Sequence, residues 1–86
     1  MTRETFRKRL ESGKSNHSIF EAPGREGVVT VWIHQGSYVL TWEECPPGEQ
    51  YNEHLYTRDE RHLFETLDDL LAFLDRRGLP LDQFHP

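Results

Sequence analysis

Hydrophobic and polar side chains alternate through the middle of the chain, on both sides of the dipeptide Gln35-Gly36. Residues 28–35 are rich in β-branched side chains and residues 37–44 alternate, so each segment is predicted to be a strand. A two-residue hairpin loop at Gln35-Gly36 pairs the strands so that their apolar side chains gather on one face. The predicted pairs on that face are Ile33 with Tyr38, Val31 with Leu40 and Val29 with Trp42.

The segment before this hairpin predicts another strand. Residues 16–23 carry several apolar side chains, and the glycines within residues 24–27 mark a turn. A four-residue loop at 24–27 is expected to extend the same apolar face. The predicted cross-strand neighbours are Ala22 with Val29, Phe20 with Val31, Ile19 with Trp32 and His17 with His34.

Two helices are expected, one near each end of the sequence. Thr2 can cap a short helix that carries Phe6 and Leu10 on one face. Thr66 can cap a second helix, which Gly78 ends. The leucines of this second helix follow the i, i+3, i+4, i+7 spacing of a buried stripe. They are Leu67, Leu70, Leu71 and Leu74.

The return from the hairpin to the second helix is less clearly patterned. Residues 45–50 contain two consecutive prolines and must leave the sheet as a loop, because proline donates no backbone hydrogen bond. We expect residues 51–58 to return as the fourth strand. Leu55 and Tyr56 have opposite parity, so the pattern does not decide which of them faces inward. Residues 59–61 are predicted to be a turn or the polar end of that strand.

These elements predict an α+β fold of order α-β-β-β-β-α, with a four-stranded antiparallel meander sheet, a short N-terminal helix and a C-terminal amphipathic helix. Residues 1–86 are predicted to form one small domain, with residues 79–86 as an irregular tail. By parity, the two tryptophans point to opposite faces. Trp42 falls on the face that the leucine helix should cover. Either the first helix or a partner protein is expected to cover Trp32.

The charge balance favours a protein partner over a nucleic acid. The chain has a net charge of −5 at pH 7. Residues 1–14 hold five basic and two acidic side chains, so the acidic excess lies in the rest of the chain, mostly within residues 42–75. Such a surface repels phosphate, and direct nucleic-acid binding is not expected. The basic residues of the first helix are the one exception: Arg3, Arg7, Lys8 and Arg9.

The sequence also predicts a cytoplasmic protein. Cys45 is the single cysteine, so an intramolecular disulfide is impossible and a reducing compartment is favoured. No apolar run reaches the roughly 20 residues that a membrane helix needs. The charged start of the chain lacks the apolar core of a secretory signal.

Few residues suggest catalytic or metal chemistry, and no cofactor is expected. His17 and His34 could hold a metal ion together with Glu21 or Glu43, but no metal-ligand motif supports such a site and no metal is predicted. The polar run of residues 54–62 gives an alternative function, a small enzyme or nuclease-like domain that acts by acid–base chemistry. The residues of that cluster are His54, Arg58, Glu60 and His62.

The favoured function is a small binding module that neutralises or regulates a basic partner protein, in the manner of inhibitor and immunity proteins. Acidic side chains would steer the partner and Trp32 would anchor it, because tryptophan is common at interaction hot spots. A second alternative is a self-associating module, a homodimer formed through Trp32 and Val39. The candidate binding residues are Trp32, Val39, Glu43, Glu44, Glu49, Glu53, Asp59 and Glu60.

Overall fold

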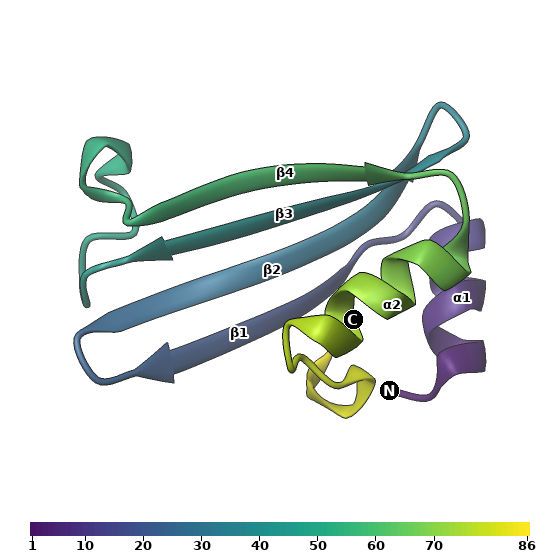
Figure 1. Ribbon diagram of the computed structural model, residues 1–86, viewed down its shortest axis with the longest axis horizontal. Coiled ribbons are helices and arrows are strands. Elements are labelled where there is room, and N and C mark those ends of the chain that lie inside the picture. Colours follow the sequence, from purple (N-terminus) through teal and green to yellow (C-terminus); the bar gives the residue numbers. More distant parts are fainter.

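The computed structural model describes residues 1–86 and has an α+β fold, with two helices and a four-stranded antiparallel sheet (Figure 1). The strands follow one another in the order β1-β2-β3-β4, so the predicted meander is confirmed. The elements are α1 (Arg3–Glu11), β1 (Asn16–Ala22), β2 (Arg25–His34), β3 (Ser37–Cys45), the 3-10 helix η1 (Glu53–Leu55), β4 (Arg58–Phe64), α2 (Leu67–Arg76) and the 3-10 helix η2 (Leu81–Gln83).

The central hairpin has the predicted register. Val29 lies opposite Trp42, and the pairing continues without interruption to His34 opposite Ser37. Gln35 and Gly36 form the two-residue turn with φ values of 50° and 81°. Positive φ at both central positions matches the right-handed twist of the flanking strands, which is why such turns are favoured in short hairpins.

The first hairpin has a shorter loop than the sequence predicted. Ala22 lies opposite Arg25, so Pro23 and Gly24 alone form the turn. Proline fixes φ at the first turn position and Gly24 has a φ of 79° at the second, a combination that suits a tight turn. The four-residue loop was therefore wrong, although the faces were assigned correctly because the register moved by an even number of residues. The observed neighbours are Phe20 with Gly27, Ile19 with Val28, and His17 with Thr30.

The fourth strand also lies elsewhere than predicted. Residues 51–57 of the predicted strand 51–58 do not form a strand, since successive turns and η1 occupy the segment before β4. The strand consists instead of the polar run Arg58–Phe64, which pairs with β3 along its length. Residues 59–61, expected as a turn, lie inside it. The sheet accepts charged side chains here because its inner positions are matched by opposite charges, as described below.

Both helices cover the same face of the sheet, which we call the inner face; the opposite side is the outer face. Figure 1 shows α1 and α2 gathered at one end, where β1 begins and β4 ends. Phe6 and Leu10 of α1 join the leucines of α2 in one core, so α1 does not cover Trp32. The core consists of Phe6, Leu10, Val29, Val31, Leu40, Trp42, Leu67, Leu70, Phe73, Leu74, Leu79 and Phe84.

The residues after α2, expected to be irregular, pack closely against the start of the chain. Phe84 is buried and its ring meets that of Phe6 edge to face, at 5.2 Å between centroids. His85 exchanges two backbone hydrogen bonds with His17, so it extends the sheet beyond β1 by one bridge. The amino group of Met1 donates to the carbonyl oxygen of Leu81 at 3.1 Å. Both ends of the chain are therefore fixed at the helical end of the sheet.

Candidate binding surface on the sheet

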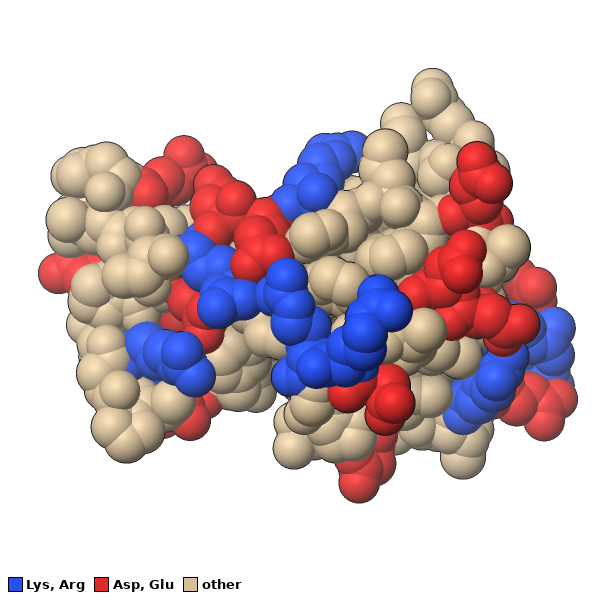
Figure 2. All heavy atoms as spheres, in the orientation of Figure 1, with Lys and Arg blue, Asp and Glu red and all other residues tan.

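The other end of the sheet, which holds the β1–β2 turn and the β3–β4 connection, has no helix on its inner face; we call it the open end. A ladder of alternating charges crosses its inner face (Figure 2). Arg25 and Arg58 both pair with Glu44, which is 4% exposed. Arg58 also pairs with Glu60 at 2.9 Å, and Arg77, the C-cap residue of α2, pairs with Glu60 at 3.0 Å. Each carboxylate in this ladder is therefore shared by two arginines.

Trp42 lies between the arginines of the ladder. The guanidinium carbons of Arg58 and Arg77 lie 5.5 and 5.3 Å from the centre of its ring, within the range of a cation–π interaction. Glu60 accepts hydrogen bonds from Arg77 and contacts His62 Nε2 at 2.8 Å, and these contacts lower the pKa of Glu60 to about 2. The charges of the inner face are thus engaged within the chain, and they hold Trp42 in place.

The outer face of the same end has a different arrangement of charges. Glu21 lies directly opposite Glu26 on the neighbouring strand, and Glu43 lies directly opposite Asp59. Like charges in directly opposed positions destabilise a sheet. None of these four carboxylates forms a salt bridge. The four strands together thus present a surface whose four carboxylates form no ion pair, which we call the acidic patch; the exposed Arg61 lies at its edge, two residues from Asp59 on β4.

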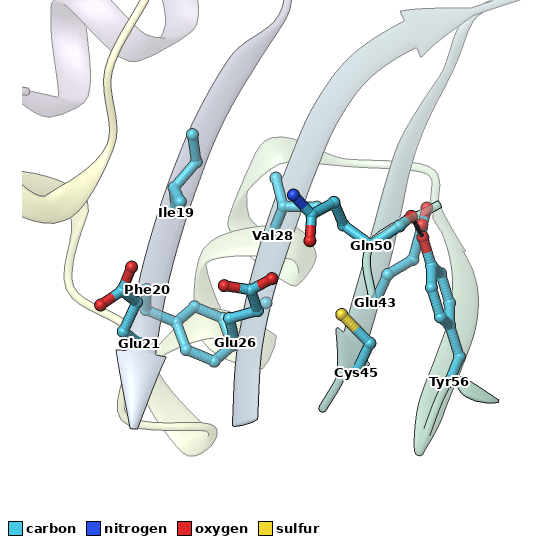
Figure 3. Close-up of a pocket in the computed structure, with 10 residues that line it drawn as sticks. Ile19, Phe20, Glu21, Glu26, Val28, Glu43, Cys45, Gln50 and Tyr56 are labelled. Atoms are coloured by element: carbon cyan, nitrogen blue, oxygen red, sulfur yellow. Dashed lines mark hydrogen bonds between the residues drawn. The ribbon is translucent and has the colours of Figure 1, made fainter. Parts of the chain in front are cut away.

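A pocket of about 340 Å³ opens within the acidic patch (Figure 3). Ile19 and Val28 give it apolar walls, and the β3–β4 connection brings Gln50 and Tyr56 to its side. The Tyr56 hydroxyl donates to the Gln50 carbonyl oxygen, which fixes the ring. No lysine, arginine or histidine lines the pocket. Its lining residues are Ile19, Phe20, Glu21, Glu26, Gly27, Val28, Glu43, Cys45, Gln50 and Tyr56.

The negative field of the patch acts on the two other titratable groups of the pocket. Burial raises the pKa of the Cys45 thiol, and the nearby carboxylates Glu26, Glu49 and Glu43 raise it further. Burial also raises the pKa of Tyr56, with Glu43 as the largest electrostatic contribution. Both groups therefore remain protonated at neutral pH, and the pocket contains negative charge that no cation offsets.

The outer face becomes apolar toward the helical end. Trp32, Val39 and Leu63 lie side by side on three adjacent strands. Val39 is 1% exposed, whereas Leu63 is 63% exposed and Trp32 is half-buried. Val39 is thus shielded by its neighbours, and the accessible apolar surface is provided by Trp32 and Leu63. A row formed by Thr30, Thr41 and the exposed Arg61, side by side on β2, β3 and β4, separates this surface from the acidic patch.

The predicted binding residues divide between the two faces. Trp32, Glu43 and Asp59 are accessible from the outer face, whereas Glu44 and Glu60 belong to the inner ladder. Glu49 and Glu53 lie in the connection between β3 and β4. The sequence reasoning missed four residues of the outer surface, because it lacked the first-hairpin register and the position of β4: Glu21, Glu26, Tyr56 and Leu63. The dipeptide Pro23-Gly24 was the signal that could have supplied that register.

The candidate metal and catalytic groupings are not assembled as the sequence suggested. His17 and His34 are not cross-strand neighbours, and no cluster of metal-ligating side chains is present. Glu60 and His62 are in contact, but their contacts belong to the inner ladder. His54 lies on η1 and is joined to neither by a hydrogen bond or ion pair.

The chain was compared with protein-family models, with curated proteins and with solved structures, and none of them matches it. No helix in the structure has both the length and the apolar character needed to cross a membrane.

Proposed function

We propose that this chain is a binding module for a basic partner protein, which docks on the outer face of the sheet. The supporting observation is the acidic patch: the opposed pairs Glu21–Glu26 and Glu43–Asp59 form no salt bridge, and the single neighbouring cation is Arg61 at the edge of the patch. Opposed like charges reduce the stability of a sheet. The inner face of the same strands shows that this chain does pair carboxylates with arginines. A basic partner would supply the missing counter-charge and would be steered to the patch.

The apolar end of the outer face would complete the interface. Interfaces commonly join an aromatic or apolar centre to a polar surround, and Trp32 with Leu63 would provide that centre. A partner that carries basic residues next to apolar ones would cover both parts of the face. Docking would cover the partner's cationic surface, which is how an inhibitor, immunity protein or regulator of the cytoplasm could neutralise a basic protein.

A labelled peptide of alternating lysine and leucine tests this function by fluorescence anisotropy. The double variant Glu43→Gln/Asp59→Asn should bind the peptide about tenfold more weakly, a change of about 1.4 kcal/mol. Binding to the unaltered chain should also weaken as salt is added, because exposed charges are screened.

The matched control is Asp75→Asn/Asp82→Asn, which removes the same charge from α2 and η2, away from the outer face. Equal weakening by the two double variants would overturn the proposal, since only the total charge would then matter. Sedimentation gives a second outcome. Self-association that Leu63→Ser abolishes, together with no peptide binding, would replace this function by the homodimer.

A further inference from the structure

We infer that the pocket of the acidic patch receives one arginine side chain of the partner. This inference deepens the proposed function and rests on it. The pocket is lined by Glu43, Cys45 and Tyr56 and forms one part of the acidic patch. The group that we expect to enter it is a guanidinium. Three features of the pocket suit an arginine: its shape, the position of its charges and its aromatic wall.

The shape suits a long side chain. A volume of about 340 Å³ lies at the small end of the range for ligand pockets, about 300–1,000 Å³. Ile19, which is 74% exposed, stands at its side with Val28, so an aliphatic stem would find apolar contacts. Cys45 is 4% exposed and no side-chain hydrogen bond involves its thiol. Figure 3 shows its sulfur pointing toward β2, into the space of the pocket.

The charges surround the pocket on more than one side. Glu21, Glu26 and Glu43 come from three successive strands. Glu26 already accepts a hydrogen bond from the Gly48 amide at 3.1 Å, which ties the β3–β4 connection to the patch. An arginine carries five N–H donors in one plane and can bind two carboxylates at once. A lysine ammonium is a compact charge that holds its water more strongly, so it gains less in a pocket with apolar walls.

The aromatic wall favours the same group. The Tyr56 ring lines the pocket, and its hydroxyl is bound to the Gln50 carbonyl oxygen, so the ring is held in place. A guanidinium group stacks on aromatic faces, which an ammonium group does less well. Apolar walls, several carboxylates and a fixed aromatic ring together describe a site for arginine.

The test uses three short peptides that differ at one central residue: arginine, lysine or citrulline. Citrulline has nearly the shape of arginine but no charge. The protein is the full chain, and binding is followed by the NMR shifts of its backbone amides. We expect the arginine peptide to shift the amides of Val28, Glu43 and Cys45, and to bind about tenfold more tightly than the citrulline peptide. The lysine peptide should fall between the two.

Protein variants locate the effect. Glu43→Gln should weaken arginine binding about tenfold, and Ile19→Ala about threefold because it removes part of the apolar wall. Asp75→Asn on α2 is the control and should leave binding unchanged. Equal binding of the arginine and lysine peptides, or of the arginine and citrulline peptides, would overturn the inference, as would shifts confined to amides outside the pocket.

The two proposals can fail separately. If binding of the longer lysine–leucine peptide depends on Glu43 and Asp59 but the arginine peptide does not enter the pocket, the acidic patch binds a basic partner and the arginine site is wrong. If neither the lysine–leucine peptide nor the arginine peptide depends on these carboxylates, the proposed function itself is wrong.

Discussion

Glu43 and Glu44 are neighbours in the sequence, yet they lie in opposite surroundings. Glu44 points to the inner face, is 4% exposed and pairs with Arg25 and Arg58. Glu43 points to the outer face, lies opposite Asp59 and lines the pocket without a cation. The comparison shows that net acidity does not locate a binding surface. Strand parity decides whether a carboxylate serves the stability of the fold or stays available to a partner.

The largest expected difference is between these two glutamates. Glu44→Ala should lower the free energy of unfolding by about 2–3 kcal/mol, below the usual cost of breaking a fully buried pair because Arg58 is partly exposed. Glu43→Ala should change it by less than about 0.5 kcal/mol, since it removes a repulsion along with a side chain. Urea unfolding of the two variants measures both values. Equal destabilisation by the two variants would contradict the view that Glu44 stabilises the fold and Glu43 does not.

The next expected effect is at Gly27, which Phe20 and the backbone of β3 approach closely. A Cβ atom on Gly27 would lie 2.5 Å from Phe20 Cζ on the inner side and 2.8 Å from the Glu43 carbonyl oxygen. Gly27→Ala should therefore cost about 2 kcal/mol of unfolding free energy. Phe20→Leu in the same chain should recover part of that loss, because it removes one of the two close contacts. Thermal unfolding that shows no loss in Gly27→Ala would contradict the close approach.

A smaller expected difference between the two faces is the pH dependence of stability. The pKa of Glu60 falls from its ordinary 4.5 to about 2 in the folded chain, so its stabilising effect is complete above pH 4.5 and is lost as pH falls toward 2. Glu60→Gln should accordingly be less stable than the unaltered chain at neutral pH, with the difference shrinking in acid. Asp59→Asn, the adjacent change on the outer face, should instead raise stability at neutral pH, because it removes the repulsion with Glu43. Unfolding midpoints measured across this pH range provide the comparison.

The smallest expected effect is an increase in the free energy of unfolding. Glu21→Lys would place an opposite charge beside Glu26 and should stabilise the sheet by about 0.2–1 kcal/mol. The same change should weaken binding of the lysine–leucine peptide, because it supplies from within the chain the charge that the partner would bring. A variant that is both more stable and unimpaired in binding would place the partner elsewhere on the molecule.

The sequence predicted those elements of the fold whose apolar residues follow a local pattern. The central hairpin and the leucine stripe of α2 follow from alternation and helical spacing, and both are found. β4 was misplaced because its inner positions are Arg58, Glu60 and His62, which read as a solvated turn. Those side chains suit a strand only because Glu44 and Arg77, distant in sequence, lie beside them. A pattern of apolar residues cannot report such long-range matches.

Only part of the candidate binding surface could be predicted from the sequence, again because it depends on residues that are distant in sequence. Trp32 and Glu43 follow from parity once the central strands are known, whereas Asp59 lies on the outer face because β4 runs from Arg58 to Phe64. Glu21 and Glu26 become neighbours only through the turn at Pro23-Gly24, whereas the sequence analysis placed a four-residue loop at 24–27. The side of the pocket is formed by the β3–β4 connection, whose path is set by prolines and turns and has no periodicity to interpret.

The absence of a helical layer over the open end has a consequence for amide hydrogen exchange. Backbone amides of β2 and β3 beneath α1 and α2 are protected by the core, and they should exchange mainly when the whole chain unfolds. Amides of the same strands near Gly27 and Glu44 lie outside that cover, so local opening should release them sooner. A docked partner would act as the missing layer, slowing exchange at the open end while leaving the helical end as it was.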